Sequence, residues 1–527
     1  MILSYILHGH IPYYAAQPPH PDPLLHAKLT RKDSPLLDVE VDTLTEHFAA
    51  SRLSYSTQAL PVNVLLDTLI RPSVDVEDAD CTTNVEWRHE PEKAVPHLVV
   101  GDASQPGGQW VENPMPASWE IQTLSYAAML SLPGYCYAQH YRRVTGEDLP
   151  VFTRPSRRDI ADYLCAYPEA VQVEDSFRNH EKLADISRTE HGFYIGSHNI
   201  HCKHLVLASG IFSEVIQPLP ILNPLRTLEP VPEIPFLVVG SGFSAADVII
   251  SAPTDQKILH IFKWDPENRP SPLRGCHHHA YPEYAGVYRL MKRAAIATSS
   301  DTTTRRPRNR RIASSGFLES RAWDVVYEGQ PNVEIAGVQM HDQDSATVTF
   351  RQPNGDIFTR PVRGLVYATG RRGTLDYLDE PLRSEVLDSS PDSSPVVSAQ
   401  SLRNKAVESL EVARDVFIVG SLTGDSLIRF AYGGCVQTAG RLIRAYSGDD
   451  RTNDKTSGKN RVSSNSSPTS SFREKKQPLA VMNGIEGHHI YPRQEAGQSG
   501  SFENGSRSFM AVHLGTWWSS FMRLWGN

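Results

Sequence analysis

Short apolar runs and helix-like stretches alternate along most of this chain. Runs such as Phe236 to Val239 and Val416 to Val419 are typical of buried strands, and a stretch with helical spacing follows each of them. This alternation favours an α/β fold with a parallel sheet. The pattern stops near residue 448, where a polar, serine-rich stretch has almost nothing to bury. We therefore predict that residues 448–527 form a disordered tail.

The first residues resemble the second half of a strand-turn-helix-strand unit. Ile2 to Leu7 have the spacing of a short amphipathic helix, Gly9 stands where a helix often ends, and Ile11 to Tyr14 are expected to form a strand. In a dinucleotide-binding fold, an apolar strand and a Gly-x-Gly-x-x-Gly turn precede such a helix. Only Met1 precedes it here. Either the pattern is accidental, or about 10 to 20 upstream residues would supply the strand and the turn.

One sequence pattern occurs twice in the chain. The stretch HGFYIGSHNIHCKHLVLASG predicts a hairpin followed by a buried strand that ends at Ala208 to Gly210. The stretch ATVTFRQPNGDIFTRPVRGLVYATG predicts a hairpin on the Asn354-Gly355 turn, followed by a buried strand that ends at Ala368 to Gly370. Either unit alone is only a hairpin. Two of them are what two dinucleotide-binding domains in one chain would show.

The clearest local motif is PFLVVGSGFSAADVII. An apolar strand leads directly into a Gly-x-Gly-x-x-Ala turn, and a helix follows. The first glycine permits a tight turn, the second allows the backbone to approach a pyrophosphate, and the alanine allows close packing of helix and strand, so the helix N-terminus faces the phosphates. The candidate nucleotide-binding residues are Gly240, Ser241, Gly242, Ser244 and Ala245.

The next apolar run, ILHIF, ends at Lys263. This is about the spacing at which an acidic residue would bind the ribose of NAD. A lysine at this position favours the additional phosphate of NADP instead. We therefore predict that NADPH is preferred over NADH.

Two further turns have a composition suited to a cofactor. In HLVVGDASQPGGQW, an apolar strand leads to Gly107, Gly108, Gln109 and Trp110, where paired glycines permit close backbone approach and the tryptophan offers a flat face. This turn either packs at the surface or lies against a flat ring system. In the later stretch VFIVGSLTGDS, a strand is followed by Gly424 and Asp425. The carboxylate either caps helix amides or accepts hydrogen bonds from a ribityl chain.

Composition and charge narrow the class of protein. The chain has 527 residues, 40% of them hydrophobic and 21% charged, and no apolar stretch approaches 18 residues, so we expect no transmembrane segment. The N-terminus lacks the positive region of a signal peptide, which predicts an intracellular, cytoplasmic protein. The net charge of −8 gives no nucleic-acid footprint, and we interpret the basic run Arg305 to Arg311 as a solvated loop.

Metal and nucleophile chemistry has little support in the sequence. The six cysteines contain no Cys-x-x-Cys pair, which argues against a disulfide framework and a structural zinc site. The run His277 to His279 lacks ligands at suitable spacing, because three adjacent histidines do not easily converge on one ion, and we interpret it as a histidine-rich loop. Serine-hydrolase and zincin motifs are absent. We therefore predict no metal and name no catalytic side chain.

The last residues, LGTWWSSFMRLWGN, differ from the polar stretch before them. Trp517, Phe521 and Trp525 fall on one helical face, with Trp518 and Met522 beside it. This pattern is typical either of a frayed, sticky end or of a short aromatic helix that docks on a protein partner or lies at a membrane surface.

Taken in order, these residues resemble the oxidative stress-induced growth inhibitor family, relatives of the flavin-containing monooxygenases. The resemblance covers roughly residues 1 to 447. It rests on LSYILHGHIPYY with HPDPLLHAKL, PGGQW, RRDIADYL, VVGSGFSAAD, YPEY at 281–284 and GSLTGDSLIRFAYGGC. It implies an NADPH-dependent flavoprotein monooxygenase that binds FAD and NADPH, acts on a small-molecule or protein nucleophile, and has a role in growth regulation and cell division.

The resemblance also implies an arrangement of domains. Two Rossmann-like domains are expected, with the NADPH-binding domain (231–365) inserted between two parts of an FAD-binding domain (1–230, N-terminally truncated, and 366–447). Trp110, Asp425 and the glycines beside them are assigned to FAD, and Thr369 and Gly370 to the strand that joins the domains. The chain lacks the Phe-x-Gly-x-x-x-His fingerprint and the first FAD glycine turn. A regulatory or scaffold protein that keeps the fold without turnover is therefore the alternative.

Overall fold

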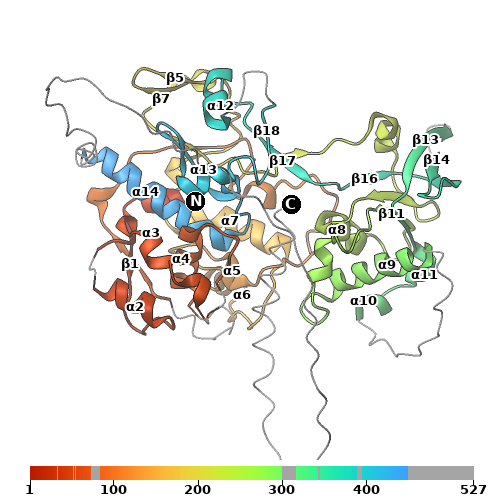
Figure 1. Ribbon diagram of the computed structural model, residues 1–527, viewed down its shortest axis with the longest axis horizontal. Helices are drawn as coiled ribbons and strands as arrows, with labels where there is room; N and C mark the ends of the chain where they lie inside the picture. Colours follow the sequence, from red (N-terminus) through yellow and green to blue (C-terminus); the bar gives the residue numbers. More distant parts are fainter. Residues whose placement is uncertain are drawn as a thin grey trace, which may run out of the picture.

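The computed structural model describes residues 1–448 except 32–33, 52, 54, 73–82, 299–315, 342–344 and 389–393. The predicted tail from 449 onward, its aromatic end and the basic run Arg305 to Arg311 lie outside the described residues. The described chain is mixed α/β and forms two lobes (Figure 1). The larger lobe contains the buried cluster that runs from Ile2 to Ile211 and from Leu375 to Ile443. The smaller lobe contains two clusters built almost entirely from residues 222–368.

The opening residues fold as their pattern predicts. Helix α1 (Ile2–Leu7) is followed by Gly9 with φ of +90° and by strand β1 (His10–Tyr14), which pairs antiparallel with β2 (Val85–His89). A Cβ on Gly9 would stand 2.6 Å from the carbonyl oxygen of Glu90. Glycine is therefore required here both by the backbone angle and by the close approach of β2.

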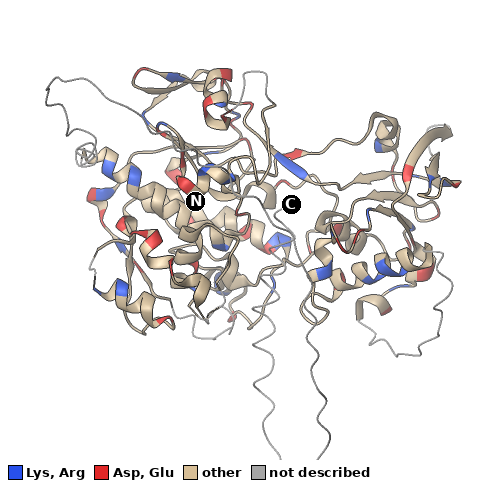
Figure 2. Cartoon of the chain, viewed as in Figure 1, with Lys and Arg blue, Asp and Glu red and all other residues tan. Residues whose placement is uncertain are grey.

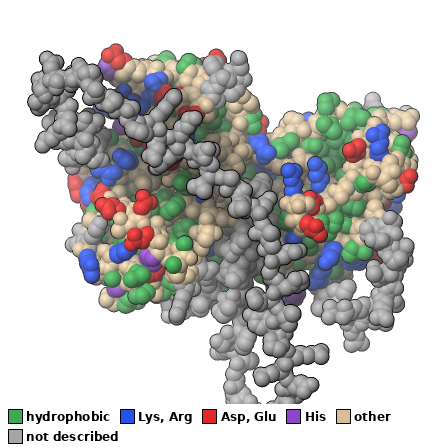
Figure 3. Space-filling view, in the orientation of Figure 1, with side chains coloured by type: hydrophobic (Ala, Val, Ile, Leu, Met, Phe, Trp, Pro, Cys, Tyr) green, Lys and Arg blue, Asp and Glu red, His purple; other side chains and the backbone are tan. Residues whose placement is uncertain are grey.

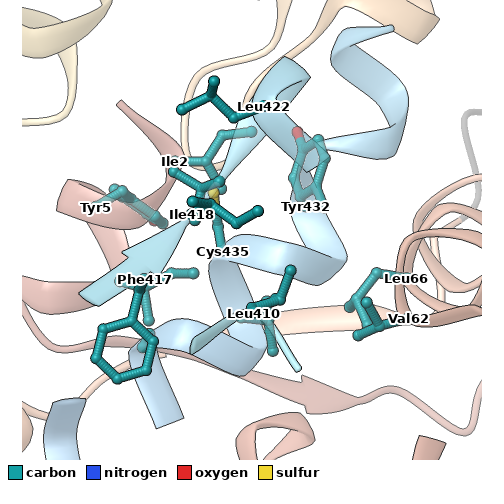
Figure 4. Packing of buried hydrophobic residues seen from close by; sticks show 14 of the residues in the cluster. Ile2, Tyr5, Val62, Leu66, Leu410, Phe417, Ile418, Leu422, Tyr432 and Cys435 are labelled. Atoms are coloured by element: carbon teal, nitrogen blue, oxygen red, sulfur yellow. The ribbon is translucent and has the colours of Figure 1, made fainter. Parts of the chain in front are cut away.

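The core of the larger lobe joins the two ends of the described chain (Figure 4). Helix α1 and helix α4 (Pro61–Ile70) pack against α14 (Tyr432–Tyr446) beside strand β20 (Val416–Ile418). Strand β20 runs parallel to β8 (Leu205–Leu207) and antiparallel to β19 (Glu411–Ala413). Segments from the start, middle and end of the sequence thus share one core.

Further helices and strands complete the larger lobe. Its helices are α2 (Pro23–Thr30), α3 (Val41–Thr45), α5 (Ala127–Leu130), α6 (Tyr137–Thr145), α7 (Arg157–Ala170), α12 (Glu380–Leu387) and α13 (Arg403–Glu408). Its remaining strands are β3 (Val99–Val100), β4 (Phe177–Arg178), β5 (Ile186–Thr189), β6 (Gly192–Ile195), β7 (Ile200–Cys202) and β18 (Val396–Val397).

The smaller lobe is built on a four-stranded parallel sheet. Its strands are β10 (Phe236–Val239), β11 (Ile258–Phe262), β12 (Tyr327–Pro331) and β16 (Leu365–Tyr367), in the order β12-β11-β10-β16. The helices are α8 (Phe243–Ser251), α9 (Pro282–Thr298), α10 (Gly316–Glu319) and α11 (Trp323–Val326). Numbered from β10, this order is 3-2-1-4, which is the first half of a Rossmann fold with one further strand.

Both predicted meander-and-strand units are present. Strands β5, β6 and β7 form an antiparallel sheet, and β8 follows it. In the smaller lobe β13 (Glu334–His341), β14 (Ser345–Arg351) and β15 (Ile357–Val362) form the matching sheet, and β16 follows. Gly355 in the second turn has φ of +92°, as expected for the predicted Asn-Gly turn.

Two short strands link the lobes. Strand β9 (Glu214–Val215) pairs antiparallel with the start of β17 (Arg371–Thr374), which also pairs with β18 (Figure 1). The chain therefore passes from the larger lobe to the smaller lobe and back at neighbouring positions. The exact domain boundaries stay a prediction. Within the described part of the chain, every helix is too short or too polar to cross a lipid bilayer.

Candidate functional site

A cavity of about 1540 Å³ is lined by residues of both lobes. The outline of the molecule is notched between the lobes in the space-filling view (Figure 3). Most of the residues predicted to bind a cofactor line this cavity, although they come from separate parts of the sequence. They are Gln109, Trp110, Gly240, Ser241, Gly242, Ser244, Lys263, Thr369, Gly370, Gly424 and Asp425. Gly107, Gly108 and Ala245 are not part of its lining.

The turn after β10 leaves its backbone open to the cavity. Gly240 has φ of +147°, and a Cβ there would lie 2.3 Å from the carbonyl oxygen of Ala368 on the neighbouring strand. Ala245 is buried behind the turn. A Cβ on Gly242, the N-cap of α8, would meet no protein atom within 4 Å, and no side chain caps the helix. The uncapped amides of α8 are therefore available to an anion.

Two side chains hold the carbonyl groups of this turn. The Nε2 atom of His260 lies 2.6 Å from the oxygen of Gly240, and the hydroxyl of Ser271 donates to the oxygen of Ser241 at 2.6 Å. Burial lowers the pKa of His260 to about 4, so the ring is neutral. Its Nε2–H donates to Gly240, and its Nδ1 accepts from the hydroxyl of Tyr327 at 2.8 Å. The carbonyl oxygens of Gly240 and Ser241 thus both have hydrogen-bond partners within the protein.

Lys263 is exposed at the end of β11 and lines the cavity together with Asn332. Asn332 is held in place because its side-chain oxygen accepts from the backbone amide of Trp264 at 2.7 Å. The sheet order places β11 and β16 on opposite sides of β10. Lys263 therefore lies on one side of the glycine turn, and Thr369 and Gly370, which follow β16, lie on the other.

The Trp110 turn projects into the cavity from the larger lobe. Gly107 has φ of +130° and precedes a short 3-10 turn, Gly108–Trp110. A Cβ on Gly107 would lie 2.8 Å from a methyl group of Val111. These glycines shape the turn, and only Gln109 and Trp110 reach the cavity.

Asp425 has a role that the local sequence did not show. Its Oδ2 accepts from the backbone amide of Leu60 at 2.8 Å and from Asn63 at 2.6 Å, and its Oδ1 accepts from Arg403 at 2.8 Å. The carboxylate is buried, with 3% of the side chain exposed. Asp425 thus joins Leu60, the residue before α4, to Asn63 and Arg403, while neither α4 nor the helix after Asp425 has a side-chain cap. Its contact with a ribityl chain stays a prediction.

Among the charged residues of the cavity wall that were not assigned from the sequence are Asp247, Arg157 and Arg371. Asp247 on α8 accepts from the hydroxyl of Tyr284 at 2.8 Å, and burial raises its pKa to about 6. Arg157 begins α7 and Arg371 begins β17. Asp247 and Arg157 lie within the quoted motifs VVGSGFSAAD and RRDIADYL, and Arg371 directly follows the second Ala-Thr-Gly strand. His260, also unassigned, is the one polar residue in the apolar run of β11.

The run His277 to His279 lies in a turn after the 3-10 segment Pro272–Gly275, as the sequence analysis expected. The three rings lie tilted against one another, with centroid distances of 4.0 to 5.3 Å. Within the described ranges, no three histidine, cysteine, aspartate or glutamate side chains form a group that could hold a metal ion.

Curated relatives share this sequence over most of its length. Oxidative stress-induced growth inhibitor 1 of Mus musculus is 25% identical over 485 residues, which cover 84% of this chain and 92% of the relative. A homologue in Caenorhabditis elegans is 23% identical and covers 85% and 93%. Oxidative stress-induced growth inhibitor 2 of Homo sapiens is 24% identical over 57% of this chain. These relatives confirm the resemblance. No family model matches the chain.

Solved structures give weaker likenesses. A flavin-containing monooxygenase from Stenotrophomonas maltophilia aligns with 66% of this chain and 91% of its own, at 14% identity and a TM-score of 0.41. An L-lysine 6-monooxygenase from Pseudomonas syringae aligns with 68% and 93%, at 16% identity and a TM-score of 0.40.

Proposed function

We propose that this chain is an NADPH-dependent flavoprotein monooxygenase that binds FAD and NADPH in the cavity between its lobes. The observation that carries the proposal is that the Gly240 turn and the Trp110 and Gly424 turns line one cavity of about 1540 Å³. Ligand pockets commonly measure about 300 to 1,000 Å³, so this cavity has room for more than one ligand. The site assignments made from separate motifs thus concern a single space.

The residues at the Gly240 turn fit NADPH. The uncapped amides of α8 suit a pyrophosphate, and the open space beside Gly242 admits it. Lys263 would bind the additional phosphate that distinguishes NADPH from NADH. His260 and Ser271 bind the carbonyl oxygens of the turn from behind. These partially negative oxygens are therefore directed away from a bound anion.

The residues on the larger lobe fit part of FAD. Trp110 is half-buried and offers a flat face to a ring system, and Gln109 offers an amide beside it. A carboxylate has about four lone-pair sites, and three donors already occupy Asp425, so it retains capacity for one further donor such as a ribityl hydroxyl. We propose that FAD lies on this side of the cavity, opposite the Gly240 turn.

Bound FAD and NADPH would supply the redox chemistry, so the chain's own residues need only bind, orient and exclude water. We further propose that residues 231–365 form the NADPH-binding domain, inserted between the two parts of the FAD-binding domain. By extension from the names of the curated relatives, we propose a role in restraining growth. The family resemblance extends this proposal to cell division.

The test is NADPH consumption by the purified full chain, followed at 340 nm with and without added FAD and compared with NADH. We expect FAD-dependent oxidation that is faster with NADPH than with NADH. Binding of both cofactors without turnover would instead indicate a regulatory or scaffold protein. Failure to bind either cofactor would contradict the proposal.

A further inference from the structure

The cavity wall contains two arginines that are at least half-buried and have no ion pair among the described residues. Arg157 is 8% exposed and Arg371 is half-buried, and both line the cavity. Neither forms an ion pair within 4.0 Å among the residues that the structure describes. A buried cation without a partner is costly, so such a site suits an anion.

The hydrogen bonds of these arginines leave donors free. The Nε of Arg157 donates to the carbonyl oxygen of Trp110 at 3.4 Å, and its guanidinium lies 3.9 Å from the ring centroid of Trp119. Its terminal nitrogens make no hydrogen bond to a described residue. Arg371 donates from one terminal nitrogen to the side-chain oxygen of Asn113. A guanidinium has five N–H donors in a planar fork, so both arginines retain donors suited to a carboxylate or a phosphate.

Asp247 acts electrostatically on both arginines, and it does not cancel their charge. It is one carboxylate facing two guanidiniums, and burial raises its pKa to about 6 while the arginines act in the opposite direction. The pKa of Arg371 is lowered mainly by burial and further by repulsion from the charge of Arg157. This part of the cavity therefore has an excess of positive charge.

The sheet order shows which ligand this charge would meet. Lys263 follows β11 and Arg371 follows β16, on opposite sides of the glycine turn after β10. If the pyrophosphate of NADPH lies at the glycine turn and its additional phosphate lies at Lys263, all phosphates of NADPH lie at the turn or on its β11 side. The basic start of β17, coloured blue between the lobes in Figure 2, lies on the other side.

We infer that Arg157 and Arg371 bind an anionic group of the substrate, a carboxylate or a phosphate, on the β16 side of the glycine turn. This inference rests on the proposed function, and it names the substrate class: a nucleophile that carries a negatively charged group. Asp247 competes with that group for the two arginines and limits how tightly they bind it.

The experiment titrates inorganic phosphate, and separately propionate, into the full chain with FAD and saturating NADP+ at constant ionic strength. Tryptophan fluorescence is the readout because Arg157 contacts Trp110 and Trp119, and calorimetry checks the affinity. We expect saturable binding that weakens at least about tenfold in Arg157→Gln and in Arg371→Gln. Arg158→Gln is the matched control, since Arg158 is its exposed neighbour and pairs with Glu120 at 2.8 Å.

A second variant is expected to bind more tightly, and misfolding could not produce that result. Asp247→Asn removes the competing carboxylate, so binding of the probes should tighten at least about threefold. Unchanged affinity in both arginine variants, or no saturable binding to the wild type, would overturn the inference. A parallel titration without NADP+ accompanies this experiment: probes that bind without NADP+ and not with it would show that the arginines hold a nucleotide phosphate, which also overturns the inference. Failure of NADP+ to bind at all, measured separately, would count against the proposed function instead.

Discussion

Two strand-turn-helix units border the cavity, and they look alike in sequence but differ in how their polar groups are used. In the β10 unit, the turn carbonyls are held from behind by His260 and Ser271, and the helix amides have no cap. In the β20 unit, the acidic group of the turn, Asp425, is bound by three donors from the protein itself. The first unit is organised for a ligand, and the second holds the larger lobe together.

The lesson concerns what a glycine-rich motif means. Both units have glycines after a buried strand, and both line the cavity. The difference lies in which polar groups are already satisfied, and that depends on residues far away in the sequence. The Gly240 unit should therefore respond to mutation mainly through ligand binding, and the Asp425 unit mainly through stability.

The largest expected effect is on the β20 unit. Asp425→Ala leaves Arg403, Asn63 and the amide of Leu60 without their buried partner, so the free energy of unfolding should fall by about 3 to 5 kcal/mol. Chemical denaturation measures this change. Asp148→Ala is the control, because Asp148 is 82% exposed and pairs only with Arg142. Equal stability of the two variants would remove the contrast between the units.

The next effect separates binding from stability in the β10 unit. Gly242→Val places a side chain in space that the protein leaves open, so stability should be nearly unchanged. Affinity for NADP+ should fall at least about a hundredfold, or about 2.8 kcal/mol, because the side chain blocks the approach of the pyrophosphate. Gly240→Ala should instead destabilise the fold, because its Cβ would contact the carbonyl of Ala368. Calorimetric titration and thermal melting distinguish the two. If Gly242→Val binds NADP+ normally, the assignment of the turn is wrong.

A pH-dependent effect tests whether the buried charge of Asp247 lowers the stability of the folded protein. Its folded pKa of about 6 lies above its usual value, so folded protein holds the proton longer and stability is lost as the pH rises from about 4 to 6. Asp247→Asn keeps an acceptor for Tyr284 and removes the buried charge. It should stabilise the protein by up to about 3 kcal/mol at pH 8, and this gain should shrink as the pH falls below 6. Melting curves across pH measure it, and a variant that is less stable at pH 8 would contradict this account.

The smallest expected effect concerns cofactor preference. Lys263→Glu should weaken NADP+ relative to NAD+ by about tenfold, or about 1.4 kcal/mol, because an exposed ion pair is lost and a repulsion is added. Lys257→Glu is the matched control, since Lys257 precedes the opposite end of the same strand. The ratio of the two dissociation constants is the measurement. An unchanged ratio would contradict the proposal that Lys263 binds the additional phosphate of NADP+.

The parts of the fold that the sequence predicted are those with local signals. Helix α1 with Gly9, the strand and turn of β10 and the Asn354-Gly355 hairpin each depend on a few adjacent residues. The partners of Asp425 could not be predicted in this way, because Leu60 and Asn63 precede it by more than 360 positions. The charged cluster of the cavity likewise joins α7, α8 and β17, which no local pattern connects.

The site residues divide along the same line. Lys263 and Gly242 could be assigned from the sequence because their residue types fit a known spacing after a strand, and their roles stay predictions. His260 was missed because a polar residue inside an apolar strand gives no indication of its partner, which here is a carbonyl 20 positions earlier in the chain. Arg157 and Arg371 were not assigned because their significance comes from lining one cavity together, although they are more than 200 positions apart in the sequence.

The central claim is that the Gly240 turn and the Trp110 side of the cavity hold NADPH and FAD within reach of each other. The most direct measurement is the flavin absorbance of the FAD-supplemented full chain near 450 nm when NADPH is added without oxygen. We expect rapid bleaching by one equivalent of NADPH, and slow or no bleaching in Gly242→Val that has been loaded with FAD to the same extent. Persistent flavin absorbance in the wild type, or equally rapid bleaching in Gly242→Val, would contradict the account.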